Sequence, residues 1–300
     1  MGISVKHISK SYKNVKALQD ISFEVKPGEL FGLIGPDGAG KTTLFRILTT
    51  LLIANEGTAT VAGFDVLHDY KSIRKHVGYM PGKFSLYQDL TIEENLEFFA
   101  TIFGTTIEEN YDLIKDIYVQ IEPFKDRRAG KLSGGMKQKL ALCCALIHKP
   151  KVLFLDEPTT GVDPVSRKEF WEMLKRLQEK DITILVSTPY MDEAALCDRI
   201  ALIQDGEILQ IDTPEAIVKH YPKQIYNVRA NNMYQLINNL NAYKYNHSVY
   251  PFGEFIHYTD SREDFEPADL VAYLESKNLL HIEIEKTEAT IEDTFMELAK

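Results

Sequence analysis

Two stretches of the sequence carry residue types suited to phosphate chemistry, and the first is residues 35–42. It reads Gly-Pro-Asp-Gly-Ala-Gly-Lys-Thr and matches the phosphate-binding loop G-x-x-x-x-G-K-[ST]. We expect the backbone N–H groups of residues 38–41 to face phosphate oxygens, because glycines let the main chain approach closely and the dipole of the following helix is positive there. Lys41 would neutralise phosphate charge, and the Thr42 hydroxyl would ligate Mg²⁺. A chance glycine-rich turn is the alternative, and the loop alone does not select one nucleotide-using family.

The second stretch is the run Lys-Val-Leu-Phe-Leu at 151–155, apolar after its first residue, which is followed by two carboxylates, Asp156 and Glu157. Such a run predicts a buried strand, and paired acids at the end of a buried strand suggest a use for their charge. Asp156 could hold Mg²⁺, directly or through water, and Glu157 could polarise an attacking water. A solvated strand end is the alternative, but it is weakened by the phosphate-binding loop upstream in the same chain.

The residues around the loop predict the elements that hold it. Residues 30–34 form an apolar run that suits a buried strand, and residues 43–48 open a helix with one apolar face. Upstream, alternating residues predict an antiparallel hairpin of strands at 3–8 and 17–25. Tyr12 lies at its turn, where an exposed ring could stack on a base; a packing role is the alternative. Further predicted elements are strands at 58–62, 77–80, 182–187, 200–204 and 207–211, and helices at 91–104, 107–121, 141–147, from the turn at 159–164 to 178, and from about 191.

Composition limits the classes of protein to which the chain can belong. Its 300 residues predict a main domain with an appendage, and its formal charge of −10 argues against a general nucleic-acid-binding surface. Three cysteines without C-x-x-C spacing, in a chain that opens without a charged-then-apolar leader, suit a reducing cytosol. The sequence contains no apolar run long enough to span a membrane, so we expect any membrane role to depend on a partner.

Taken together, these residues resemble the nucleotide-binding subunit of ATP-binding-cassette (ABC) transporters. Residues 35–42 match the phosphate-binding loop of the family, and residues 152–157 match its Mg²⁺ strand and catalytic acid. The most discriminating match is Leu-Ser-Gly-Gly-Met at 132–136, the family signature with Met136 where glutamine is usual. Gly-Val-Asp at 161–163 matches the D-loop. The resemblance spans about residues 1–215.

The resemblance implies a fold and a set of site residues. The fold would be α/β, a phosphate-loop NTPase cassette at 1–220 with a mixed sheet core, an antiparallel β subdomain and an inserted helical subdomain at about 86–150. The cofactors would be ATP and Mg²⁺, with Thr42 and Asp156 on the metal and Glu157 as the catalytic base. The implied nucleotide-binding residues are Tyr12, Gly35, Asp37, Gly38, Ala39, Gly40, Lys41, Thr42, Thr43, Ser133, Gly134 and Gly135.

The resemblance also implies partners and a location. Two subunits would pair head to tail, with Ser133 and the amides of Gly134 and Gly135 reaching the γ-phosphate held by the other subunit. The protein would be the ATPase of an exporter, cytoplasmic and peripheral on the inner face of the cell membrane, and would drive a separate transmembrane permease. Phe84, Leu86 and Tyr87 are the candidate contacts for that permease, although burial in their own loop is the alternative.

Two positions depart from the pattern of the family. Gly82 stands where a glutamine contacts Mg²⁺ and the attacking water, and Pro189 stands where a histidine contacts the γ-phosphate. Losing such contacts costs about 10²- to 10³-fold in rate, by analogy with the removal of one oxyanion donor. We therefore expect slow turnover in the chain's own site and pairing with a different ABC subunit; an ordinary homodimer is the alternative. A non-hydrolytic regulator is the second candidate function, and a soluble ABC factor is a third.

The remaining residues, 221–300, differ in composition and predict a separate α+β extension. Asparagine and tyrosine are frequent at 227–246, residues 255–258 are strand-like, and Pro267 suits the first turn of a helix. We expect the order strand, helix, strand, helix, strand and a final helix at 291–298. The segment resembles the C-terminal extension of drug- and polysaccharide-type exporter ATPases, in which it could be regulatory, dimer-stabilising or structural.

Overall fold

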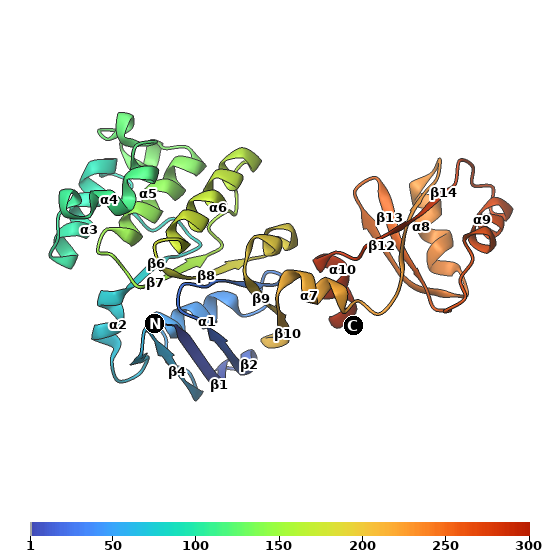
Figure 1. Cartoon of the computed structure of the whole chain (residues 1–300), viewed down its shortest axis with the longest axis horizontal. Helices are drawn as coiled ribbons and strands as arrows, with labels where there is room; N and C mark the ends of the chain where they lie inside the picture. The colour runs from blue at the N-terminus through green and yellow to red at the C-terminus, as the bar shows by residue number, and fades with distance from the viewer. Residues whose placement is uncertain (1) are drawn as a thin grey trace. The chain divides into compact units, whose positions relative to one another are not determined.

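The computed structural model describes residues 2–300, and the chain divides into two compact units (Figure 1). The first unit runs to Glu215, and the second comprises Ala216–Leu298. The short helix α7, Pro214–Lys219, lies at the point where the chain passes from one to the other. In the described part of the chain no helix is both long and apolar enough to cross a bilayer.

A six-stranded sheet forms the core of the first unit, in the order β10-β9-β3-β8-β7-β6. Its strands are β3 Leu30–Ile34, β6 Val77–Met80, β7 Val152–Asp156, β8 Thr183–Thr188, β9 Arg199–Gln204 and β10 Glu207–Asp212. All neighbours are parallel except β10, which pairs antiparallel with β9. Every residue of β3, β7 and β8 is buried, as expected for parallel strands covered on both faces. Because the strands are parallel, their carboxyl ends meet at one edge.

A second, antiparallel sheet in this unit has the order β2-β1-β4-β5. Its strands are β1 Ile3–Tyr12, β2 Val15–Val25, β4 Glu56–Val61 and β5 Phe64–Asp65. The predicted hairpin at 3–25 is present, with Tyr12 paired with Val15 at its tip. One continuous apolar core joins this sheet to the six-stranded one, and the helix α1, Lys41–Leu48, contributes Phe45, whose ring packs edge-on against Phe154 at 5.7 Å.

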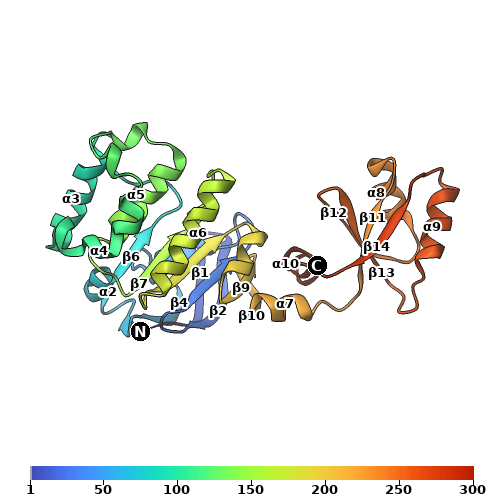
Figure 2. The same ribbon diagram turned by 45° about the horizontal axis from the view of Figure 1, so that its top comes forward.

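Two helices of the first unit begin at capping boxes. Thr91 and Thr106 each form a capping box with the glutamate three residues on, and these boxes open α3, Ile92–Phe103, and α4, Ile107–Tyr118. Both helices pack with α5, Gly134–Leu146, at one side of the unit (Figure 2). The remaining helices are α2 Tyr70–His76, α6 Pro164–Gln178 and the 3₁₀ helices η1 Glu122–Phe124, η2 Ala129–Lys131 and η3 Met191–Leu196.

The second unit is a four-stranded antiparallel sheet with two helices packed on one face. Its elements are β11 Ile225–Arg229, α8 Met233–Ala242, β12 Asn246–Phe252, β13 Phe255–Asp260, α9 Pro267–Ser276, β14 Glu283–Thr287 and α10 Ile291–Leu298. The strand order β12-β13-β11-β14 with this sequence of elements is the split β-α-β arrangement. Ile256 and Tyr258 of β13 belong to the core with residues of α8 and α9.

One strand of this unit was missed by the sequence-based prediction. The predicted order has a single strand between the two helices, whereas the structure has the hairpin of β12 and β13. Pro251 within β12 argues against a strand, because proline cannot donate to a ladder. β12 lies at the edge of the sheet, where a missing donor is tolerated.

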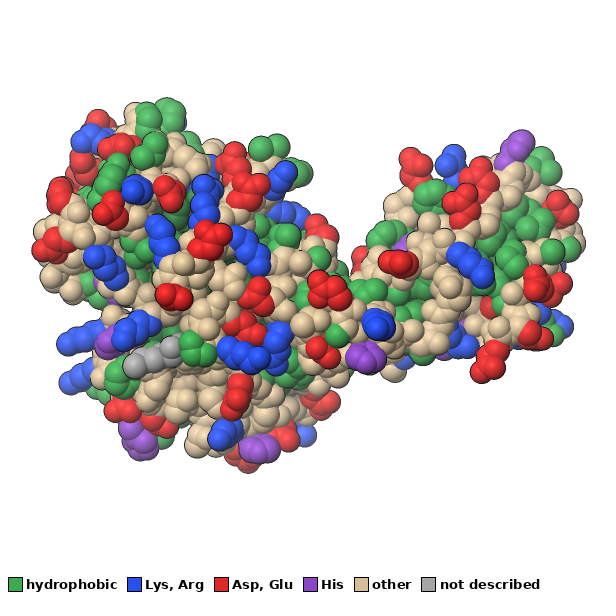
Figure 3. Space-filling view, viewed as in Figure 1, with side chains coloured by type: hydrophobic (Ala, Val, Ile, Leu, Met, Phe, Trp, Pro, Cys, Tyr) green, Lys and Arg blue, Asp and Glu red, His purple; other side chains and the backbone are tan. Residues whose placement is uncertain are grey.

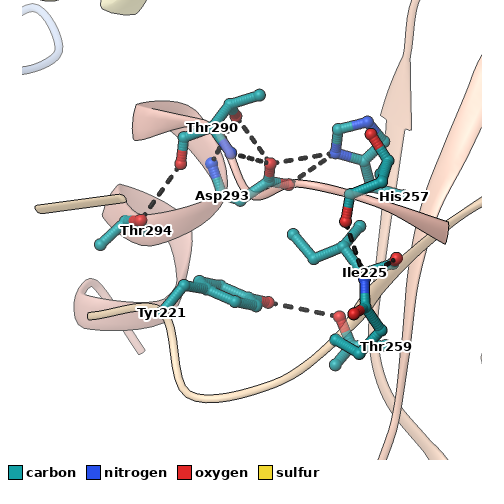
Figure 4. A network of polar contacts seen from close by, with 9 residues as sticks. Tyr221, Ile225, His257, Thr259, Thr290, Asp293 and Thr294 are labelled. Atoms are coloured by element: carbon teal, nitrogen blue, oxygen red, sulfur yellow. Dashed lines mark hydrogen bonds and ion pairs between the residues drawn. The ribbon is translucent and has the colours of Figure 1, made fainter. Parts of the chain in front are cut away.

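Polar side chains attach α10 to the sheet of the second unit (Figure 4). His257 of β13 is buried, and its Nδ1 lies 2.8 Å from Asp293 Oδ1. Asp293 Oδ2 also accepts hydrogen bonds from the backbone N–H and the hydroxyl of Thr290, while the Thr290 hydroxyl accepts one from the Asp293 N–H. Asp293 therefore both caps α10 and joins it to β13.

Acidic and basic side chains are interspersed over the surface of the first unit in the view of Figure 3.

All three cysteines, Cys143, Cys144 and Cys197, are buried free thiols, and burial raises the pKa of each.

Candidate functional site

The phosphate-binding loop connects β3 to α1, as the sequence predicts. Gly38 and Gly40 have φ values of 84° and 104°, a conformation that side chains with a Cβ rarely adopt. A Cβ at Gly40 would also lie 2.4 Å from the carbonyl oxygen of Ala17 in β2, so glycine is needed there. Asp37 and Gly38 are exposed, whereas Gly35 and Ala39 are buried, and Thr42 and Thr43 at the start of α1 are half-buried. The tip of the loop is therefore exposed to solvent, while the residues that anchor it are buried or half-buried.

Lys41, the first residue of α1, lies beneath this loop. Its side chain is only 2% exposed, and its Nζ donates to the carbonyl oxygens of Gly35 at 2.8 Å and Pro36 at 2.9 Å. A third contact joins Nζ to Glu157 Oε1 at 3.1 Å. An ammonium group has three donors, and all three are engaged. A phosphate oxygen that reaches Lys41 must therefore replace one of these contacts.

The two carboxylates predicted from the end of β7 lie at this same place. Asp156 is 2% exposed, and its Oδ1 accepts a hydrogen bond from the Ser187 hydroxyl at 2.7 Å. Glu157 follows directly, and its side chain turns to Lys41. The structure thus brings the phosphate-binding loop, with its Lys41, next to Asp156 and Glu157, although the loop and the two acids are more than 100 residues apart in the sequence.

The oxygen donors near the loop fit a hard cation. Within residues 2–300 there is no cluster of three or more His, Cys, Asp or Glu side chains that could enclose a metal ion. Mg²⁺ is usually held by one or two protein oxygens together with waters and substrate phosphates, so the hydroxyl of Thr42 and the carboxylate of Asp156 form a suitable set. Burial, together with the charge of Asp156, raises the pKa of nearby Tyr79 to about 12, so its phenol stays neutral.

The other predicted nucleotide-binding residues lie in separate elements. Tyr12 is 43% exposed, with Lys10 Nζ 5.8 Å from the centre of its ring. Ser133 caps α5, and its hydroxyl accepts from the Met136 N–H at 3.4 Å. Ser133 and Gly134 are exposed, and the Cβ that Gly135 lacks would lie 2.7 Å from the hydroxyl of Ser166. Within residues 2–300, no hydrogen bond joins the segment 133–135 to the phosphate-binding loop.

The sequence of this chain is similar to those of known proteins. A family model described as ABC transporter matches residues 18–160. The Nod factor export ATP-binding protein I of Rhizobium sp. (strain N33) is 36% identical over 247 residues, which are 81% of this chain and 81% of that protein. The chain belongs to the ABC transporter family.

Other ABC proteins match about 70–74% of this chain. The probable multidrug ABC transporter ATP-binding protein YbhF of Escherichia coli (strain K12) is 41% identical over 215 residues, and the chain spans 37% of its length. A solved ATP-binding subunit of an ABC transporter matches with a TM-score of 0.67 at 27% identity, over 74% of this chain and 93% of that one. The cassette MJ0796, solved as a dimer bound to ADP and Pi, has a TM-score of 0.64 at 26% identity and covers 70% of this chain and 98% of its own.

The two departures from the ABC pattern lie beside the site. A Cβ at Gly82 would lie 3.1 Å from the Asp156 carbonyl oxygen and 3.9 Å from Asp156 Oδ2. The first atom of a side chain at position 82 would therefore be next to the Asp156 carboxylate. Pro189 follows Thr188, the last residue of β8, whose carbonyl oxygen accepts from the Gly35 N–H at 3.3 Å. The backbone at both positions is therefore close to the site, while the polar side chains usual in the ABC family are missing.

An apolar groove of about 420 Å³ lies between β6, α2 and the helices α3 and α5 of this ABC cassette. Leu86, one of the three predicted permease contacts, lines it but is only 8% exposed. The other two lie elsewhere: the ring of Phe84 is 5.5 Å from Lys137 Nζ, and the half-exposed Tyr87 packs edge-on against Phe98. The groove is lined instead by side chains that the sequence analysis did not select, among them Leu51, Phe99, Ile102, Phe103 and His148.

His148 adds a polar atom to the floor of this groove. Its ring stacks on Phe103 with the centroids 3.8 Å apart, and its Nε2 donates to the Val77 carbonyl oxygen at 3.1 Å. Burial lowers the pKa of His148 to about 4, so the ring is neutral at physiological pH. A lone histidine in the sequence offers no signal of this position, because the stacking partner and the acceptor come from other elements.

Proposed function

We propose that the chain is an ATP-binding, energy-coupling subunit of an exporter, which binds Mg·ATP and hydrolyses it slowly in its own site. The observation that carries the proposal is the convergence of Lys41, Asp156 and Glu157 at a loop with the backbone conformation of a phosphate cradle. The names of the relatives support the transport role, since one exports Nod factor and another is a probable multidrug transporter subunit.

In this proposal the main residues of the site have the following roles. The amides of residues 38–41 hold the β- and γ-phosphates, and Lys41 exchanges its contact with Glu157 for a phosphate oxygen. Glu157, released from Lys41, accepts a proton from the attacking water. Thr42 and Asp156 hold Mg²⁺, which neutralises the charge that develops on the phosphates. Tyr12, exposed at the hairpin tip, stacks on the adenine ring.

In the proposed dimer, the segment at Ser133 of this chain completes the site of a second subunit. Ser133 and Gly134 are exposed and Gly135 is half-buried at the start of α5, where the Ser133 hydroxyl and the two glycine amides reach a γ-phosphate held by another ABC subunit. Because Gly82 and Pro189 remove two polar contacts from this chain's own site, the partner is a different ABC subunit with a complete site. This head-to-tail dimer is cytoplasmic and drives a separate permease from the inner face of the membrane. The groove at Leu86 and Ile102 receives the permease.

Purification of the chain alone and with a co-expressed second ABC subunit tests this proposal. We expect ATP binding by the chain alone with slow turnover, and faster turnover by the pair. In the pair, Ser133→Glu should lower turnover strongly because it opposes the phosphate of the partner's site, whereas Lys131→Glu, at a neighbouring exposed position, should change it little. Robust turnover by the chain alone that Glu157→Gln abolishes would contradict the slow-site assignment.

A non-hydrolytic regulator is the second candidate, and Gly82 and Pro189 are the observations that favour it. ATPase assays of the assembled complex separate the two functions. If Glu157→Gln leaves the complex unchanged in both turnover and transport while ATP binding by this chain is still required, the chain regulates rather than hydrolyses.

A further inference from the structure

Ser187, the next-to-last residue of β8, lies between the two acids of the site. Its hydroxyl donates to Asp156 Oδ1 at 2.7 Å and accepts from the Glu157 N–H at 3.0 Å. The same N–H also reaches the Ser187 carbonyl oxygen at 3.1 Å. Ser187 is fully buried and directly opposite Asp156 in the register of β7 and β8. A single residue therefore contacts both acids.

The direction of these hydrogen bonds is fixed by chemistry. The Glu157 N–H can only donate and the Asp156 carboxylate can only accept, so the single hydroxyl hydrogen of Ser187 must point to Asp156. This leaves Asp156 Oδ2 on the side of Gly82, where a Cβ would lie 3.9 Å from it. Ser187 thus holds one oxygen of the acid and sets the direction of the other.

The backbone of Glu157 requires such support. Its φ is 50°, in the left-handed region, where a residue that is neither glycine nor asparagine is strained. A strained conformation persists only when its surroundings determine it, and both acceptors of the Glu157 N–H belong to Ser187. The turn at Glu157 carries the side chain to Lys41.

We propose that Ser187 is a positioning residue of the hydrolytic site, which orients Asp156 toward the metal and holds Glu157 in the conformation that directs it into the site. This inference rests on the roles proposed above for Asp156 and Glu157. Removal of a group that orients a metal ligand typically costs 10- to 100-fold in metal affinity or activity, which sets the size of the expected effect.

The test measures metal binding directly, without turnover. Mn²⁺ replaces Mg²⁺ as a probe, and its binding to the full chain with a non-hydrolysable ATP analogue is followed by electron paramagnetic resonance. We expect Ser187→Ala to weaken Mn²⁺ binding by about 10- to 100-fold. Binding of a fluorescent ATP analogue in EDTA should stay within twofold of the unchanged chain, because Lys41 and the loop are intact.

Thr159 offers a matched control. Like Ser187 it is fully buried near the site, but its hydroxyl has no hydrogen-bond partner in the described part of the chain. Thr159→Val removes this hydroxyl at constant shape and should leave Mn²⁺ binding unchanged. Ser187→Cys keeps a weaker donor at the same position, and its Mn²⁺ affinity should lie between those of Ser187→Ala and the unchanged chain; it decides the question if Ser187→Ala does not fold.

Three results would overturn the positioning role of Ser187. They are normal Mn²⁺ binding in both Ser187 variants, a loss of Mn²⁺ affinity in Thr159→Val equal to that in Ser187→Ala, and a loss of nucleotide binding in EDTA by Ser187→Ala that parallels its loss of Mn²⁺ binding. The last result would mean that the hydroxyl only supports packing. If the unchanged chain binds neither the analogue nor Mn²⁺, the proposed function itself fails, and this outcome is distinct from the other three.

Discussion

Lys41 and Glu157 form an ion pair, with Nζ 3.1 Å from Oε1, between the first residue of α1 and the residue that follows β7. The side chains are 2% and 22% exposed, so the pair is screened little by water. It joins the group expected to bind phosphate to the group expected to activate water. In the proposed mechanism nucleotide binding and release of the base would be coupled, because a phosphate oxygen would compete with Glu157 for the same ammonium group.

This competition predicts opposite effects of Glu157→Gln on binding and on turnover. A neutral amide competes less well for Lys41, so ATP should bind a few-fold more tightly. Turnover should fall by about 10²- to 10⁴-fold, because the general base is lost. Glu169→Gln, which removes a more exposed partner of Lys139, is the control and should change neither quantity. Weaker ATP binding in Glu157→Gln would argue against a competition between Glu157 and a phosphate oxygen for Lys41.

Restoring the missing polar groups should raise turnover. Gly82→Gln places an amide beside Asp156, and we expect a gain of about 10-fold or more from one added contact at the phosphoryl-transfer site. The Cβ would lie 3.1 Å from the Asp156 carbonyl oxygen, so a shift of a few tenths of an ångström is needed. Gly82→Ala causes the same shift without the amide and is the matched control. Equal rates in the two variants would show that the amide does not reach the reaction.

Tyr12 should contribute to nucleotide affinity through its ring alone. Base stacking is worth about 1–3 kcal/mol, so Tyr12→Ala should weaken ATP binding by about 5- to 160-fold, and Tyr12→Phe should preserve it. Tyr70 has a similar exposure, 41% against 43%, and Tyr70→Ala serves as the control. Titration with a fluorescent ATP analogue distinguishes these variants. An unchanged affinity for ATP in Tyr12→Ala would mean that Tyr12 has a packing role only.

Asp293 should make the attachment of α10 sensitive to acid. Burial raises the pKa of this carboxyl, but hydrogen bonds from His257 and Thr290 outweigh burial and hold the pKa below its ordinary value of 3.8. The stabilisation is therefore present above pH 3.8 and is lost as the pH falls through the lower folded value. Near neutral pH, Asp293→Asn should cost about 3 kcal/mol, because it breaks a buried pair.

Hydrogen exchange of the amides of residues 291–298 measures this effect. We expect faster exchange in Asp293→Asn than in Glu292→Gln, since Glu292 is exposed on the same helix. Thermal unfolding between pH 2 and 5 should show a weaker pH dependence in Asp293→Asn than in the unchanged chain. Identical pH profiles would mean that Asp293 does not carry the acid sensitivity.

The apolar groove predicts a variant that separates binding of the permease from ATP hydrolysis. Ile102 lines the groove and is 59% exposed, so Ile102→Asp should fold normally and place a charge on an apolar contact. Co-purification with the permease should fall, while the basal ATPase rate of the isolated chain should not change. Val119 is 52% exposed and does not line the groove, and Val119→Asp is the control.

The sequence predicted those elements whose signals are local. The helix and strand flanking the loop at 35–42, and the strand ending at Asp156, are each specified by a short apolar run next to glycines or acids. The groove itself was not predicted, because it forms where β6 and three helices from separate parts of the sequence meet. The permease contacts at Phe84, Leu86 and Tyr87 stay a prediction, and Tyr87 is exposed as expected. The strand β12 was missed because Pro251 argues against a strand wherever its place in the sheet is unknown.

The sequence by itself determined that a phosphate-binding loop, a lysine and two acids are present, and that polar side chains are missing at Gly82 and Pro189. Only the tertiary structure decided how they meet. Glu157 turns to Lys41, and Ser187 lies 31 residues beyond Asp156 in the chain but directly opposite it. These contacts depend on which strands are neighbours and in what register, and strand pairing is set by burial of the whole sheet rather than by any local run of residues.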